Sequence, residues 1–149
     1  MRAGIKIRSL EARDAAAMAR LSYSAPQAGN WDTSNYERLG ELGMEGWVAV
    51  RNEQIVGFLI ARCAASELEI LNVVVAQEFR RAGAATALLA TCFSSASQQG
   101  ARKAFLEVRE SNHAAISLYQ REGFHISGRR VQYYQDPHED ALLMTRLLL

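Results

Sequence analysis

The sequence predicts an α/β (α+β) fold, with a mixed central sheet of about seven strands and helices on both of its faces. Two observations support this class. Short apolar, β-branched segments alternate with segments of helical periodicity along the 149 residues. Only two helices follow strands as crossovers, whereas the first four strands form a meander. The expected order β-α-α-β-β-β-α-β-α-β-β is neither doubly wound nor a pure sandwich.

Composition restricts the class of protein. Hydrophobic residues make up 49% of the chain and charged residues 22%, which is typical of a globular protein, and we expect one domain over residues 1–149. The formal net charge of +1 argues against a nucleic-acid-binding surface. No apolar stretch is long enough for a signal peptide or a membrane span, so we expect a cytoplasmic protein that does not bind membranes.

The first third of the chain predicts one strand and two helices. Ile5 and Ile7 alternate with charged residues, so residues 4–9 form a strand. Residues 14–24 form a helix that ends before Pro26. A second helix follows, with the N-cap candidates Asp32, Thr33 and Ser34, and it covers Tyr36, Leu39 and Leu42.

The next elements are strands. Residues 47–51 and 55–63 predict a hairpin that turns at Asn52 and Glu53. Residues 67–75 are mostly apolar and β-branched in their second half, which is typical of a buried strand.

Glycines mark the ends of the two later helices. Residues 84–99 predict a helix that ends at Gly100, and residues 112–122 predict another that ends at Gly123. The remaining strands are expected at 103–108, 124–131 and 140–147, with a polar loop at 132–139.

A candidate anion site lies in the turn between strand 67–75 and the helix that follows it. The first turn of that helix exposes unpaired N–H groups at the positive end of the helix dipole. Gly83, Ala84 and Ala85 are small enough for a ligand to approach the backbone, and Arg80 and Arg81 add positive charge. This combination is suited to a phosphate or a pyrophosphate.

Three phosphate-binding patterns compete for this turn. A Walker loop needs a Lys followed by Ser or Thr after its last glycine, and no such pair follows Gly83 in the turn. A Rossmann turn needs three glycine-like positions, for which Gly83, Ala85 and Thr86 are the only candidates. The pattern Gln/Arg-x-x-Gly-x-Gly/Ala is met by Arg80, Gly83 and Ala85. An ordinary strand-to-helix turn is the structural alternative.

The segment LEVRESNHAAISLYQREGF, residues 106–124, carries the other candidates. Glu107 is acidic within an apolar strand, and Asn112 is suited to cap a helix. With this segment, the run 69–75 and the later residues Arg129, Arg130, Tyr133, Tyr134 and 139–144, the chain resembles the GNAT acetyltransferase superfamily. Within it, the chain resembles the bacterial ribosomal-protein alanine N-acetyltransferase family, which is similar to archaeal and eukaryotic N-terminal acetyltransferases. The resemblance covers residues 67–146.

The resemblance implies the GNAT fold, acetyl-CoA as cosubstrate and a role for each matching residue. Glu107 matches the general base, and Tyr119, 12 positions later, matches the general acid. The strand backbone would pair with the pantetheine arm, the loop would hold the pyrophosphate, and the cap asparagine would contact CoA. The matching cofactor residues are Val73, Val74, Val75, Arg80, Arg81, Ala82, Gly83, Ala84, Ala85, Thr86 and Asn112.

The chain departs from the family pattern at three places. Gln77 replaces a common proline, Ala85 stands where glycine is usual, and Asn30-Trp31-Asp32 replaces Pro-Trp-Ser. Since the last departure lies on the acceptor side, the identity of the acceptor is the least specified feature. The residues expected to line the acceptor site are Trp31, Glu69, Tyr133 and Tyr134.

The chemistry is consistent with these residue types. An α-amine titrates near pH 8, so about a tenth of it is neutral at pH 7, whereas a lysine is far less so. A partly buried glutamate can take the proton directly or through one water, and a tyrosine can protonate the departing thiolate. A strand N–H, that of Val73 or Val74, can polarise the thioester oxygen. Cys63 and Cys92, expected to be free buried thiols, are not needed, and no metal site is expected.

Each candidate also has an ordinary structural explanation. Glu107 can be a salt-bridged strand residue, Tyr119 a core residue, and the two arginines surface charge. His113, His125 and His138 have no spacing for a metal or a triad and are expected at the surface. The functional alternatives are a GNAT enzyme that acetylates a small amine or a lysine, and a CoA-binding module that needs a partner. A monomer or a weak homodimer is expected, and the sequence does not name the acceptor.

Overall fold

The computed structural model describes residues 4–23, 33–81 and 83–148. Trp31, Ala82, the N-cap candidate Asp32 and the predicted break at Pro26 lie outside them. The elements are β1 (Lys6–Ser9), η1 (Ala12–Asp14), α1 (Ala15–Tyr23), α2 (Thr33–Glu37), β2 (Glu45–Arg51), β3 (Gln54–Ala64), β4 (Glu67–Val75), η2 (Gln77–Phe79), α3 (Ala84–Gln98), β5 (Lys103–Arg109), α4 (His113–Arg121), β6 (His125–Tyr134) and β7 (Glu139–Leu147).

The strands form one sheet in the order β1-β2-β3-β4-β5-β7-β6. Neighbouring strands are antiparallel except β4 and β5, which are parallel and joined through α3. The predicted order of elements and the predicted mixed sheet of seven strands are therefore confirmed. The single parallel pair occurs where a helix, rather than a hairpin, carries the chain back.

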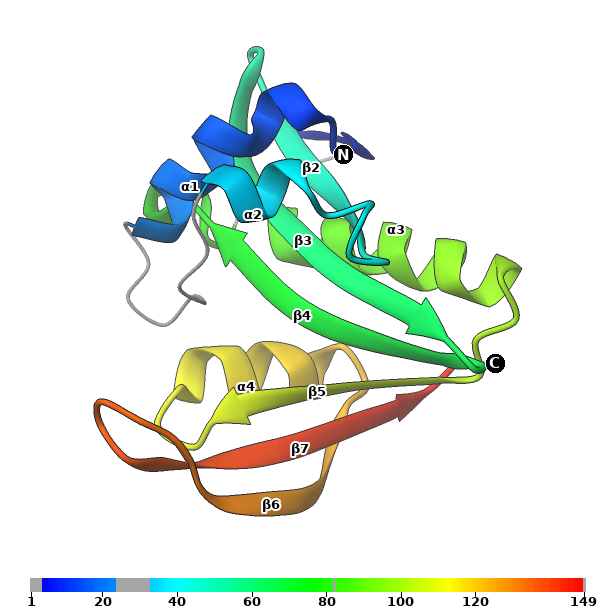
Figure 1. The fold of residues 1–149 in the computed structure, drawn as a ribbon, viewed down its shortest axis with the longest axis vertical. Coiled ribbons are helices and arrows are strands. Elements are labelled where there is room, and N and C mark those ends of the chain that lie inside the picture. The colour runs from blue at the N-terminus through cyan, green and yellow to red at the C-terminus, as the bar shows by residue number, and fades with distance from the viewer. Residues whose placement is uncertain (1–3, 24–32, 82, 149) are drawn as a thin grey trace.

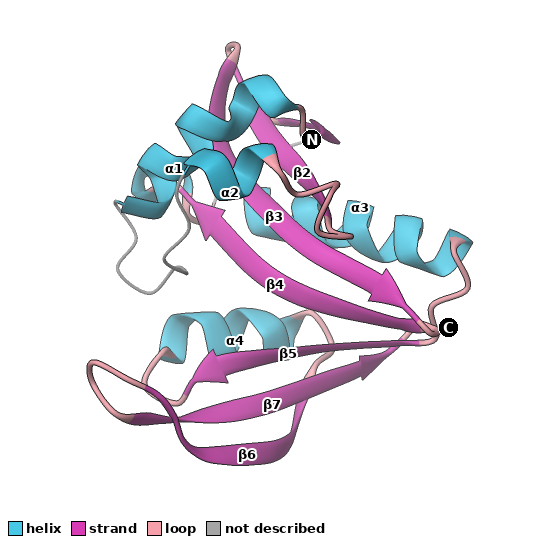
Figure 2. Cartoon of the chain, viewed as in Figure 1, coloured by secondary structure: helices cyan, strands magenta, loops and turns pink. Residues whose placement is uncertain are grey.

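Helices cover the sheet unequally (Figures 1 and 2). On one side, α3 and α4 pack with the strands around a large apolar cluster that includes Leu88, Leu106 and Tyr119; we call it the α3–α4 face. On the other side, α1 and α2 pack over a smaller cluster that includes Tyr36 and Phe58; we call it the α1–α2 face. In the described part of the chain, no helix lies on the α1–α2 face of β5, β7 and β6. That part of the face is where Glu107 projects.

Local sequence rules account for most elements. In β5, Ala104, Leu106 and Val108 are buried while the residues between them are partly exposed, as period-two alternation requires. Asn52 and Glu53 both have positive φ, 50° and 66°, which a two-residue type I′ hairpin needs.

The second helix is shorter than expected. Helix α2 ends at Glu37, and residues 38–43 form turns, with Leu42 N donating to Leu39 O and Gly43 N to Gly40 O. Glycine at position 40 disfavours the helix. Tyr36 lies in the helix as expected, but Leu39 and Leu42 lie in the turns after it, and the Leu42 side chain is 42% exposed.

Two further differences concern the last strands and a cysteine. Strand β6 continues to Tyr134, so Tyr133 and Tyr134 belong to a strand rather than to a loop over 132–139. The strand passes a register irregularity between Arg130 and Tyr134, which a period-two pattern does not reveal. Cys92 is buried, but Cys63 is only half-buried.

Candidate active site

Strands β4 and β5 separate halfway along their length (Figure 1). Their parallel pairing is limited to three positions, Glu67 with Lys103, Leu68 with Ala104 and Glu69 with Phe105. Beyond Glu69, β4 keeps its pairing with β3, and β5 keeps its pairing with β7. Within the described residues, the edges of β4 and β5 that face each other there have no partner strand, so they can pair with an extended ligand.

The direction of the β4 backbone separates the three predicted valines. Ala76 N donates to Val56 O of β3 at 2.8 Å, and the carbonyl of Val74 also points toward β3. Because backbone groups alternate along a strand, Val73 and Val75 direct theirs toward β5. Arg80 Nε donates to Val75 O at 3.3 Å, which agrees with this direction. The structure therefore favours Val73 and Val75 over Val74 for pairing with a ligand.

The turn into α3 presents the backbone amides that the sequence predicted. Gly83 is the N-cap, with φ of 86°, a conformation that suits glycine, and Arg81 also has positive φ, 68°. Ala87 N makes the first bond into the helix, to Gly83 O at 3.0 Å, so the three preceding amides lack helical partners. These amides belong to Ala84, Ala85 and Thr86.

The side chains of the same residues have separate contacts. The Ala84 side chain is buried in the core, whereas Arg80 and Arg81 are exposed. Thr86 Oγ1 donates to Glu122 Oε2 at 3.1 Å, which links the start of α3 to the end of α4. An anion would therefore be held mainly by the backbone of this turn, with the exposed Arg81 beside it; Arg80 is also exposed, but its Nε is bonded to Val75 O.

Glu107 lies beside the point where the strands separate. Arg130 Nε is 2.9 Å from Glu107 Oε2, and the Glu107 side chain is 17% exposed. Glu107 Oε2 is buried. Because the Arg130 N–H is not aligned with it, this oxygen accepts no hydrogen bond within the described residues. The carboxylate is thus held by the charge of Arg130, and its Oε2 atom remains able to accept a hydrogen bond from a ligand. The ordinary ion-pair explanation and the catalytic one are both compatible with this geometry.

Tyr119 projects from α4 into the α3–α4 face. Its side chain is 7% exposed, and its ring packs edge-on against Phe124 with the centroids 5.6 Å apart. Burial raises the pKa of the phenol, and the nearby Tyr134 raises it further. No hydrogen bond of its hydroxyl is formed within the described part of the chain. Tyr119 therefore keeps its proton well above neutral pH and has it available for donation.

Tyr134 lies close to both predicted catalytic residues. Burial raises its pKa to about 12, with a second contribution from the Glu107 charge. The Arg109 guanidinium lies 4.4 Å from the centre of the Tyr134 ring. The rings of Tyr133 and Tyr134 pack edge-on, with their centroids 5.1 Å apart. Tyr133 is half exposed on the same strand. The structure thus brings both tyrosines to the surroundings of Glu107, as expected for an acceptor site.

A polar network fixes the turn that carries these tyrosines. Arg109 donates to Gln135 O at 3.2 Å and Pro137 O at 3.2 Å and contacts Glu139. The second Glu139 oxygen accepts from Ser111 N at 2.5 Å. Hydrogen bonding from Ser111, first from its side chain and then from this backbone N–H, lowers the pKa of Glu139. The turn between β6 and β7 is therefore tied to the end of β5, next to Glu107.

The structure also places two further predicted residues, and of these Asn112 caps a helix as expected. Asn112 caps α4, its Oδ1 accepting from Ala115 N at 3.1 Å, which leaves its amide NH₂ for a ligand. Glu69 forms an ion pair with Arg62 at 2.8 Å and stands at the last paired position before the strands separate. It faces the same side as Phe105 and Glu107.

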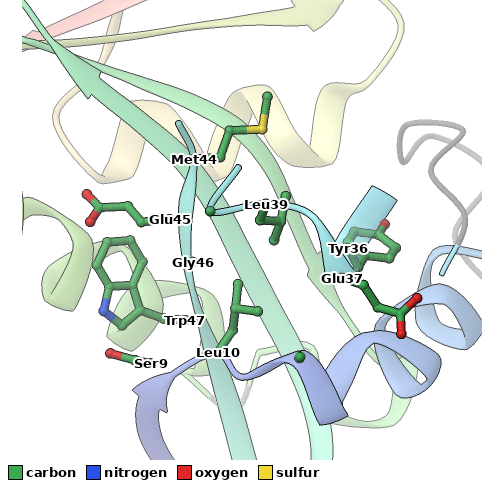
Figure 3. Close-up of a pocket in the computed structure, with 11 residues that line it drawn as sticks. Ser9, Leu10, Tyr36, Glu37, Leu39, Met44, Glu45, Gly46 and Trp47 are labelled. Atoms are coloured by element: carbon green, nitrogen blue, oxygen red, sulfur yellow. The ribbon is translucent and has the colours of Figure 1, made fainter. Parts of the chain in front are cut away.

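A pocket of about 310 Å³ lies elsewhere, between the end of β1, the turn after α2 and the start of β2 (Figure 3). Its lining includes Tyr36, Met44 and Trp47. The carboxylates of Glu37 and Glu45 point away from each other, and Glu45 accepts a bond from Gln99. The pocket contains none of the predicted site residues and is separated from Glu107 by β3 and β4.

Three other features were expected from the sequence: histidines at the surface, no metal site and no membrane span. His113, His125 and His138 are exposed, as predicted. Across residues 4–23, 33–81 and 83–148, no group of three or more His, Cys, Asp or Glu side chains is placed to hold a metal ion. None of the helices in these ranges is long and apolar enough to cross a membrane.

Sequence reasoning missed three residues around the site. Arg130 lies against Glu107, Arg109 holds the turn that carries Tyr134, and the Nδ2 atom of Asn72 is buried without a partner among the described residues. Arg130 and Asn72 lie inside the motifs that carry the family resemblance, but no local pattern assigns them a role. Their contacts depend on how distant strands are aligned.

Strand β4 leads through a short turn into α3, whose N-cap is Gly83, and this strand-turn-helix order is the one that the resemblance implied. The sequence pattern of the Acetyltransferase (GNAT) family matches residues 11–124, and the chain belongs to this family. The predicted family is thus confirmed.

Several proteins similar to this chain are named as N-acetyltransferases. The chain is 34% identical over 96 residues to the [ribosomal protein bS18]-alanine N-acetyltransferase of Escherichia coli K12, covering 63% of this chain and 65% of that protein, slightly less than two thirds of its length. It is 34% identical over 125 residues to an N-alpha-acetyltransferase of Saccharolobus solfataricus, covering 75% and 74%. The crystal structure of the E. coli ribosomal-protein-S18-alanine N-acetyltransferase has a TM-score of 0.83 and 28% identity, with 97% and 94% coverage.

Proposed function

We propose that this protein is an acetyl-CoA-dependent N-acetyltransferase that acts on the α-amine of a protein N-terminus, including that of a ribosomal protein. The observation that carries the proposal is the separation of β4 from β5 beside Glu107, with Tyr119 on the opposite face of β5. The relatives named as a [ribosomal protein bS18]-alanine N-acetyltransferase and as an N-alpha-acetyltransferase support the acceptor class. Acetyl-CoA would supply the acetyl thioester as cosubstrate.

The cofactor would be held by backbone rather than by side chains. The edge amides and carbonyls of Val73 and Val75 would pair with the pantetheine arm. The amides from Arg81 to Thr86 would hold the pyrophosphate at the start of α3, with Arg80 and Arg81 adding charge. The amide of Asn112 remains available for a further contact to CoA, since its Oδ1 is used as a cap.

Glu107 would act as the general base. Its buried Oε2 has a charge contact with Arg130 but no aligned hydrogen bond within the described residues, so one lone pair remains for the proton of the amine. Tyr133, Tyr134 and Glu69 surround the same face and would line the acceptor. The route needs no covalent enzyme intermediate.

Tyr119 would act as the general acid toward the departing sulfur. A phenol whose pKa is raised by burial is a weak acid, so the sulfur must be basic to take its proton. Burial raises the pKa of thiols as well, and it raises the pKa of the Cys92 thiol to about 12. A buried thiolate is therefore a stronger base than an exposed one. A thiolate that forms in the same apolar surroundings would therefore match the phenol in basicity.

Replacing Tyr119 by Phe tests this role. We expect kcat to fall about 10- to 100-fold, with CoA affinity unchanged, because only the hydroxyl is lost. The thermal midpoint should stay close to that of the native protein, since the ring keeps its contact with Phe124. Full activity in steady-state kinetics would leave Tyr119 with a packing role only.

The acceptor is tested by measuring thiol release from acetyl-CoA against a panel of amines. The panel contains peptides with free N-termini beginning with Ala, Ser, Met and Gly, the same peptides with a blocked N-terminus and a free lysine, and spermidine. We expect turnover only with free α-amines, because these are the most neutral at pH 7. The preference among first residues would then identify the class of target protein.

Other results would assign a different function. Turnover only with lysine or spermidine would show a GNAT enzyme of the small-amine or lysine class. Retained CoA binding without turnover of any amine would show a module that needs a partner.

A further inference from the structure

Asn72 is a partly buried residue whose side-chain nitrogen has no hydrogen-bond partner in the described residues. It lies in β4 past the last position paired with β5, and its Nδ2 atom is buried without a hydrogen bond. Such an atom normally finds an acceptor in a folded protein, and leaving it without one is unfavourable. The only other buried side-chain atom of this kind in the described ranges is Glu107 Oε2. One atom is a donor and the other an acceptor.

Both side chains face the same side of the sheet. Asn72 is directly opposite Ile60, whose side chain lies in the cluster of the α1–α2 face. Glu107 alternates with Leu106 and Val108, which belong to the α3–α4 face, so it also projects to the α1–α2 face. Asn72 and Glu107 therefore lie on either side of the separation between β4 and β5.

A bulge in β4 produces this position for Asn72. Ile60 pairs with Asn72 and Ala61 with Ile70, so Leu71 is an extra residue in β4. An extra residue shifts the alternation of all later side chains by one. Without it, Asn72 would share the α3–α4 face with Leu68 and Ile70, and its amide would lie away from Glu107.

We propose that Asn72 is a positioning residue that holds the water through which the acceptor amine passes its proton to Glu107. The amide NH₂ can only donate, so it cannot bind an ammonium group directly. A water can accept one bond from Asn72 Nδ2 and one from the amine N–H while it donates to Glu107 Oε2. This single molecule satisfies both buried atoms and aligns the transfer.

The proton balance follows from this arrangement. The charged amine gives one proton to the water, and the water gives one of its own to Glu107; the second proton, lost by the nitrogen as it becomes an amide, restores the Tyr119 hydroxyl after Tyr119 has protonated the sulfur. The nitrogen lone pair then forms the N–C bond to the acetyl group, and the C–S bond breaks with its electron pair on sulfur. Tyr119 supplies the proton that converts this thiolate to the thiol. The proposal rests on the proposed acetyltransferase function but not on the identity of the amine.

The test uses Asn72→Leu and Asn72→Asp in the full-length protein. Both keep approximately the shape of asparagine and remove the donor, one without charge and one with a carboxylate. We expect kcat/KM for the amine to fall about tenfold in each, with CoA affinity retained. The thermal midpoint of Asn72→Leu should not fall, because a buried amide without a partner is replaced by an apolar group. Lys103→Gln, which removes a contact of β4 with β5 at their paired end, is the control and should keep its turnover.

A double-mutant cycle separates this role from a general structural one. If Asn72 acts through the proton path of Glu107, Asn72→Leu should change turnover less than about threefold in a Glu107→Gln background. Full multiplication of the two defects, unchanged turnover of both single variants or a clearly lowered thermal midpoint would overturn the proposal. The native protein is assayed first. If it accepts spermidine or lysine rather than α-amines, only the acceptor proposal fails and the cycle is run with that amine; if it accepts no amine, both proposals fail.

Discussion

Glu107→Gln should lower kcat/KM for the acceptor about 100- to 1000-fold at pH 7 while CoA still binds. Glutamine has nearly the same shape but cannot take a proton from the amine. The fold should tolerate the change, because Arg130, the partner of the carboxylate, is 61% exposed and can be hydrated. The measurement is the rate of acetyl transfer from pH 6.5 to 9.5, together with CoA affinity by calorimetry.

The pH dependence gives this prediction its direction. An α-amine has a pKa of about 7.7 to 8.0, so it is mostly charged at pH 7 and mostly neutral at pH 9. A base is needed less as the amine loses its proton to solvent, so the defect should shrink as pH rises. Glu67→Gln, which removes another ion-paired carboxylate at the paired end of the same strands, is the matched control. A Glu107→Gln variant with native turnover at every pH would show that Glu107 is only an ion-pair residue.

Gly83→Glu should weaken CoA binding about 100-fold, and Gly83→Gln only about tenfold. Gly83 caps α3 with a positive φ, so any side chain there introduces similar strain, of the order of 1 kcal/mol. The two variants have the same size and therefore differ mainly in charge. A carboxylate beside the first amides of α3 would repel a pyrophosphate and compete for those amides.

Salt dependence distinguishes charge from bulk. The extra loss in Gly83→Glu should decrease as ionic strength rises, because the turn is exposed and its charges are screened. The loss in Gly83→Gln should not change with salt. Equal affinities for both variants would show a purely steric effect, and native affinity in Gly83→Glu would contradict the anion site. Calorimetric titration with CoA at two salt concentrations makes both comparisons.

Much of the fold follows from local patterns. The bounds of β4 and the start of α3 agree with the prediction, because an apolar β-branched run and a glycine cap depend only on neighbouring residues. Gly100 and Gly123 adopt the positive φ values, 90° and 92°, expected where helices end. The second helix was overextended because the apolar spacing of Leu39 and Leu42 is helical, while Gly40 between them favours turns and Leu42 is not buried.

The candidate site divides in the same way. Its residue types, the glutamate in an apolar strand, the tyrosine on the next helix and the small residues of the turn, can be recognised along the chain, and so can the family. Their environment cannot. The contact of Arg130 with Glu107, the bulge at Leu71 that turns Asn72 toward the same face, and the separation of β4 from β5 all depend on the register of strands distant in sequence. That register is set by packing across the whole sheet, because shifting a strand by one residue exchanges the faces of all its side chains.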